Sequence, residues 1–128
     1  MAKKVGGSKK KKKQEPEYNA KERFQNVKIL VKTSRPKEAI AYIYLTYCDL
    51  VDKKHKKPRE IFQTIREYAI TCVNELEQKP QSVYPFVSKI ESIIYGGVEP
   101  TPKEFESTIQ LFSTLHKEIT GKSFSFSL

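Results

Sequence analysis

Apolar side chains recur at three- and four-residue steps in four separate stretches of this chain, and this spacing limits the fold more than any other feature. The stretches are residues 36–53, 61–77, 82–95 and 101–121. In each of them, the spacing places the apolar side chains on one face of a helix, and such a face must be buried against another element. A chain of 128 residues has room for one hydrophobic core. The sequence therefore predicts an all-α protein, a compact bundle of three to four short helices.

Helix start and stop signals delimit these stretches. Thr101-Pro102-Lys103-Glu104 combines a threonine cap, a first-turn proline and a glutamate three residues after the cap, which is a capping box. Phe62 opens the apolar face of the 61–77 helix, and Lys79-Pro80 should end that helix. Pro85 should lie in the first turn of the 82–95 helix, and Gly96-Gly97 predicts a left-handed stop after it.

The segment 18–33 leaves two alternatives open. Phe24, Val27 and Val31 fit one face of a helix, whereas Val27, Ile29 and Val31 alternate like a strand. We favour a helix because good helix formers lead into the segment and no partner strand is evident.

Positive charge is concentrated outside the predicted bundle. The formal net charge is +9, and the first 13 residues contain seven lysines and no acid, which leaves +2 for residues 14–128. These lysines are Lys3, Lys4, Lys9, Lys10, Lys11, Lys12 and Lys13. Such a segment has too few apolar side chains to offset its ordering entropy. We therefore expect a disordered basic tail at 1–17, a helical bundle at 18–122 and a short C-terminal tail at 123–128, which either docks on the bundle or stays loose.

A second basic cluster lies between the first two predicted helices. It consists of Lys53, Lys54, Lys56, Lys57 and Arg59. Lysines after a helix often only complement its dipole, but five basic residues within seven positions exceed that need. No aromatic side chain interleaves with either cluster, so we expect contacts to phosphate rather than base stacking.

Neither catalysis nor metal binding has support in the sequence. His55, in the basic connection, and His116, expected at the polar edge of the last helix, have no cysteine or carboxylate at metal-ligand spacing. Cys48 and Cys72 fall within apolar helical patterns, which indicates buried free thiols; an interhelical disulfide is the alternative. We expect no enzyme activity, no metal and no cofactor.

Several phrases resemble a known family. They are Arg35-Pro36-Lys37-Glu38-Ala39, Thr64-Ile65-Arg66-Glu67-Tyr68, Ile94-Tyr95-Gly96-Gly97 and Thr101-Pro102-Lys103-Glu104-Phe105. Over residues 34–120, this order resembles a small helical domain of unknown function, family 4129, although Ile65 stands where that family usually has proline. That domain often ends membrane-anchored, transglutaminase-like proteins in neighbourhoods with AAA-type ATPases. The resemblance implies a helical fold and a protein-interaction role, and it implies no catalytic residue.

The lysine tail resembles the tails of archaeal and eukaryotic ribosomal proteins. Clustered ammonium groups attract polyphosphates by releasing counterions, without a fixed geometry. The sequence therefore predicts a nonenzymatic, RNA-binding and ribosome-associated accessory protein, with both basic clusters on the phosphate backbone. A protein-protein interaction module associated with an ATPase or envelope assembly is the alternative. No stretch reaches the roughly 20 apolar residues of a membrane span, and the acidic Gln14–Glu17 follows the lysines where a signal peptide needs apolar residues. We expect a cytoplasmic location.

Overall fold

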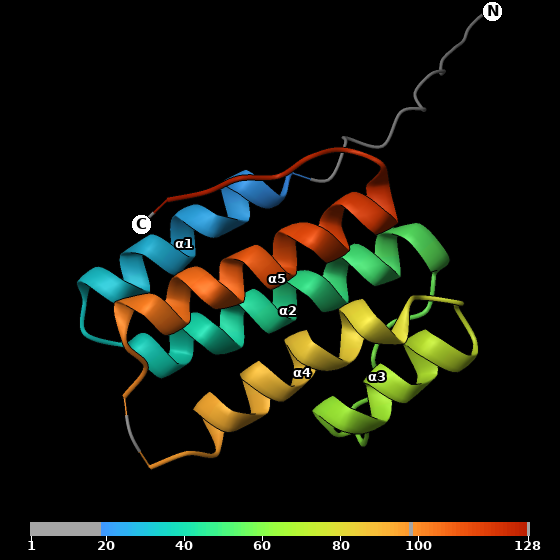
Figure 1. Ribbon diagram of the computed structural model, residues 1–128, viewed down its shortest axis with the longest axis horizontal. Coiled ribbons are helices and arrows are strands. Elements are labelled where there is room, and N and C mark those ends of the chain that lie inside the picture. Colours follow the sequence, from blue (N-terminus) through green and yellow to red (C-terminus); the bar gives the residue numbers. More distant parts are fainter. Residues whose placement is uncertain (1–18, 98, 128) are drawn as a thin grey trace, which may run out of the picture.

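The computed structural model describes residues 19–97 and 99–127, and within them every regular element is a helix. The prediction of an all-α bundle is confirmed, but the described part has five helices rather than three to four. They are α1 (Ala20–Lys32), α2 (Pro36–His55), α3 (Ile65–Asn74), α4 (Pro80–Ile94) and α5 (Pro102–Thr120) (Figure 1).

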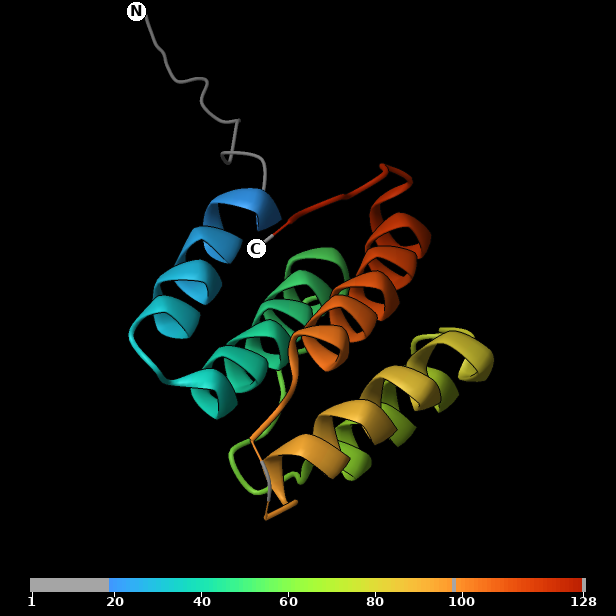
Figure 2. The same ribbon diagram turned by 60° about the vertical axis from the view of Figure 1, so that its left-hand side comes forward.

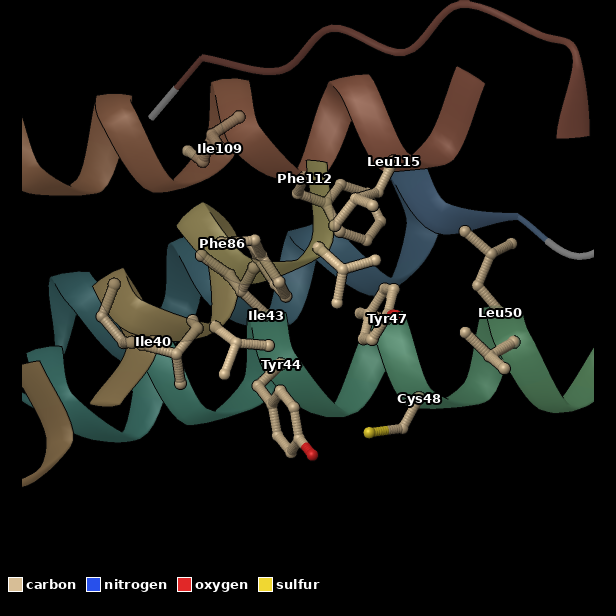
Figure 3. Close-up of a cluster of buried hydrophobic side chains, with 14 of the residues drawn as sticks. Ile40, Ile43, Tyr44, Tyr47, Cys48, Leu50, Phe86, Ile109, Phe112 and Leu115 are labelled. Atoms are coloured by element: carbon tan, nitrogen blue, oxygen red, sulfur yellow. The ribbon is translucent and has the colours of Figure 1, made fainter. Parts of the chain in front are cut away.

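The longest helix, α2, lies at the centre of the bundle. It packs against α1, α4 and α5, and α4 packs in turn against α3 and α5. Figures 1 and 2 both place α1 and α3 on opposite flanks. The apolar faces of the helices meet around α2, and Figure 3 shows side chains from α2, α4 and α5 in this core. The largest fully buried side chains include Phe24, Ile40, Ile43, Tyr47, Tyr68, Phe86, Ile90, Phe112 and Leu115.

The open question over residues 18–33 is settled in favour of a helix for the described part. Asn19 caps α1, because its side-chain oxygen accepts a hydrogen bond from the Glu22 N–H at 3.1 Å. Phe24 and Val27 are fully buried, as the helical alternative requires, whereas Ile29 is 56% exposed. A strand would have placed Val27 and Ile29 on the same face, so their different burial excludes it.

The α3 helix begins later than the sequence predicts. Residues 61 to 64 form a turn instead, in which the Arg59 guanidinium donates hydrogen bonds to the carbonyls of Glu60 (3.3 Å) and Gln63 (2.7 Å). A capping box between Thr64 and Glu67 then starts the helix at Ile65. The prediction that Phe62 lies on the inner helical face is therefore wrong, since this side chain is 77% exposed.

Two further boundary predictions are also wrong. Pro80 is the first residue of α4 rather than a stop for α3, because its missing N–H costs nothing in a first turn. Pro85 consequently lies inside α4 instead of in its first turn. The left-handed stop predicted at Gly96-Gly97 is wrong as well, because Tyr95 caps the end of α4 in the right-handed region and neither of the two glycines has a positive φ. Gly96 is needed for space instead: a Cβ there would lie 2.5 Å from the Ser92 carbonyl oxygen.

The predicted boundaries of α5 are confirmed. Thr101 and Glu104 form the expected capping box, and the helix ends at Gly121 in the left-handed conformation, with φ of 78°.

The C-terminal segment docks on the bundle along α1 and α5 (Figure 1). The Phe24 ring lies 4.9 Å from the Phe124 ring and 5.2 Å from the Phe126 ring, and Phe124 also meets Phe112 at 5.2 Å. Such edge-on aromatic contacts add to the stabilisation from burial alone. Side chains of the C-terminal segment thus join α1 to α5, which share no close backbone contact.

Candidate nucleic-acid interface

Three helix termini meet at one end of the bundle, where α1 begins and where α2 and α5 end (Figures 1 and 2). Lys53 and Lys54 from α2 line one pocket together with Lys122, which follows α5. Lys122 also lines a neighbouring pocket with Asn19 and Lys21 at the start of α1. We call the four lysines at this end, Lys21, Lys53, Lys54 and Lys122, the basic end.

The position of Lys122 is fixed by its own backbone. Its carbonyl oxygen accepts a hydrogen bond from His116 Nδ1 at 2.9 Å, which makes this ring nitrogen the protonated one. Its N–H donates to the Thr120 hydroxyl at 3.1 Å. His116 itself is buried, so the prediction that it lies at a polar edge is wrong. Its ring holds the residue that follows the Gly121 cap of α5 at the basic end.

The lysines of α2 reach the basic end because this helix continues to His55. Lys53, Lys54 and His55 form its last turn, where positive charge complements the helix dipole. Lys56 adopts the left-handed conformation, with φ of 57°, and ends the helix. The side chains of Lys53, Lys54 and Lys56 are all exposed.

Two members of the predicted cluster of five basic residues have partners within the fold. Lys57 pairs with Glu75, the residue that caps the end of α3, at 3.4 Å, and the Lys57 carbonyl accepts a hydrogen bond from the Tyr68 hydroxyl at 2.7 Å. Arg59 donates to carbonyls of the turn before α3. Lys57 thus links the 56–64 connection to the end of α3, whereas Arg59 ties the turn before α3 together, and both charges have a role without a nucleic acid.

The seven predicted tail lysines, from Lys3 to Lys13, lie outside the described residues. Asn19 is the first described residue, and it borders the pocket that contains Lys21 and Lys122. The chain that carries the lysine block therefore enters the fold at the basic end. Lys21 and Lys122 were not predicted as site residues, because only the fold brings them close to Lys53 and Lys54.

The two cysteines are buried free thiols, as predicted. Burial raises the pKa of the Cys48 thiol to about 12 and that of the Cys72 thiol to about 11. Cys48 and Tyr44 point from α2 away from α5 (Figure 3). Because only the thiolate is a good nucleophile, neither residue is activated at neutral pH.

The described part of the chain contains neither a candidate metal site nor a candidate membrane-spanning helix. No group of three or more histidine, cysteine or acidic side chains there is arranged to hold a metal ion. None of the described helices combines the length and the hydropathy that crossing a bilayer requires.

Comparisons with known proteins identify no relative. No protein-family model, no curated protein and no solved structure matches the chain.

Proposed function

We propose that this chain is a nonenzymatic RNA-associated protein, and specifically a ribosome-bound accessory of the cytoplasm, that grips phosphate backbone with its lysine tail and its basic end. One observation carries the proposal: the segment with seven lysines joins the fold beside Lys21 and Lys122, which border the same pockets as Lys53 and Lys54. The two sources of positive charge can therefore contact one polyanion at the same time.

Electrostatics favours backbone contact over sequence readout. Each phosphate neutralised by a lysine releases counterions, so that affinity falls with salt at a log–log slope of about −0.9 per contact on a duplex. If all seven tail lysines contact phosphate, they contribute a slope of about −6. Lysine is a flexible point charge without the bidentate geometry of arginine, so we expect recognition by charge and shape with little sequence preference.

The basic end is tested by a pair of double variants. We expect K53Q/K54Q to reduce the salt slope for a structured RNA by up to about 2, because two phosphate contacts are removed. The control K32Q/K103Q removes the same charge from two exposed lysines at the opposite ends of α1 and α5. Fluorescence titrations across a salt series measure both slopes. Equal slopes for the two variants would remove the basic end from the proposal.

A second candidate function, a protein-protein interaction module, is favoured by a different surface. Ile61 and Phe62 are 94% and 77% exposed, although the turn that presents them is well tied down. Gln63 donates its N–H to the Glu60 carbonyl at 3.0 Å and accepts from the Glu60 N–H at 2.8 Å. A rigid turn with two large apolar side chains is a typical anchor for a pocket on another protein. Phe124 and Phe126 of the C-terminal segment, by contrast, are packed against the core.

Nuclease treatment distinguishes the two functions, because a protein partner stays bound after nuclease whereas a partner held through RNA is released. If the chain is an interaction module, a partner retained on the immobilised protein persists after nuclease treatment and is lost with Phe62→Ser. Phe105→Ser would unfold the core and is unsuitable as a comparison, whereas Tyr95→Ser changes another exposed aromatic residue and serves as the control. Loss of all partners on nuclease treatment would favour the RNA-associated function instead.

A further inference from the structure

The basic end contains a pocket that is lined by apolar side chains as well as by lysines. A pocket of about 260 Å³ opens between the last turns of α2 and α5. Leu50 and Ile119 line it and are almost fully buried, so they form an apolar floor. Lys53, Lys54 and Lys122 line the same pocket with exposed residues at its rim.

This combination selects a class of ligand. Pockets for drug-sized molecules occupy about 300–1,000 Å³, so this one suits a smaller group. Ammonium groups at the rim suit a phosphate, and an apolar floor suits the face of a base or a sugar. A nucleotide unit has both an anionic and an apolar part, whereas inorganic phosphate lacks the apolar part.

The concave shape of the pocket also favours an unpaired nucleotide over a paired one. In a paired helix the bases are stacked inside, and only phosphate and sugar reach a protein that follows the backbone. An unpaired nucleotide in a bulge or loop can rotate outward and enter a pocket at low cost.

From this geometry we infer that the pocket between the ends of α2 and α5 binds one unpaired nucleotide of a structured RNA, with its phosphate among Lys53, Lys54 and Lys122 and its base against Leu50 and Ile119. The inference rests on the proposed RNA association and deepens it by adding a structural preference. The RNA is held by charge along the tail, while the pocket selects where along the RNA the bundle settles.

The experiment compares three RNA hairpins that differ at one site: fully paired, with a one-nucleotide bulge, and with the same bulge lacking its base. We expect the full-length protein to bind the bulged hairpin about five- to tenfold more tightly than either of the others, since the floor offers one base only a small apolar contact area. Fluorescence anisotropy at about 0.1 M salt measures the three affinities.

Three variants connect the preference to the pocket. Thr120 is exposed and lines the pocket, so Thr120→Tyr should fill it without a change of charge and abolish the preference. Thr120→Ala removes the same hydroxyl, which accepts the Lys122 N–H, without filling the pocket, and it should keep the preference. Thr114→Tyr introduces tyrosine at an exposed position of α5 that does not line this pocket, and it should also keep the preference. The three-hairpin comparison on the unaltered protein decides the inference even if Thr120→Tyr fails to fold.

The possible outcomes separate the inference from the function on which it rests. Equal binding of all three hairpins would overturn the inference and leave the RNA association standing. Equal preference for the bulge with and without its base would also overturn it, because the preference would then reflect flexibility of the RNA. Binding of none of the hairpins would overturn both. A preference that requires the base and is lost only in Thr120→Tyr supports the pocket.

Discussion

Deleting residues 1–13 is expected to lower the affinity for a structured RNA by at least about a hundredfold at 50 mM salt. The deletion removes seven positive charges and would reduce the salt slope by about 6, because each lost phosphate contact removes about 0.9. Lys53 and Lys54 would remain and contribute a slope of about −2. Titrations of both proteins at several salt concentrations measure the two slopes.

A full-length protein with all seven tail lysines changed to glutamine is the matched control. It keeps the length of the tail, so it should bind as weakly as the deletion if charge is the cause. Unchanged affinity after the deletion would exclude the tail as a binding element. Strong binding by the glutamine protein would show that the tail acts through something other than its charge.

The second large effect is on stability. We expect Phe24→Ala to lower the free energy of unfolding by about 3–5 kcal/mol, because it removes a fully buried ring and leaves a cavity. This ring contacts Phe112 of α5 at 5.0 Å and both aromatic side chains of the C-terminal segment. A loss of this size is a large part of the 5–15 kcal/mol that typically separates folded and unfolded domains. Chemical denaturation measures it.

Ile29→Ala is the control for this substitution. Ile29 lies in the same helix and is half-exposed, so its truncation should cost less than about 1 kcal/mol. If both substitutions destabilise the protein equally, the packing of α1 described above is incorrect. The result also bears on function, because α1 carries the lysine tail to the basic end.

Local sequence signals predict those parts of the fold that local interactions decide. The capping box at Thr101 starts α5 and the left-handed Gly121 ends it, and the sequence predicts both signals because each involves only neighbouring residues. The burial of Phe24 and Val27 follows from helical periodicity, which was preferred over the strand pattern.

Tertiary contacts decide the remaining features, and periodicity alone does not reveal them. Phe62 continues the apolar pattern of α3, yet Arg59 binds the carbonyls of the turn and holds this residue outside the helix. The sequence pattern places His116 at the surface, but in the structure the chain turns at Gly121 and the Lys122 carbonyl accepts a hydrogen bond from the His116 ring. In each case the deciding partner is a side chain or carbonyl that the periodic pattern does not identify.

The candidate site shows the same division. Composition identified the lysine block and the cluster after α2, but it did not show that Lys57 pairs with Glu75 or that Arg59 binds the Gln63 carbonyl. Lys21 and Lys122 join Lys53 and Lys54 only because α1, α2 and α5 have their termini at the same end. Their positions in the sequence, about 30 and 70 residues from Lys53, give no sign of this proximity.

The central claim is that positive charge from the tail and from the basic end holds one polyanion. The most direct test is the binding of the purified full-length protein to a structured RNA from dilute buffer to 200 mM salt. We predict tight binding in dilute buffer and a log–log slope between about −6 and −8, the sum expected from the tail and the two lysines of α2. An absence of binding even in dilute buffer, or an affinity that does not change with salt, would contradict the claim.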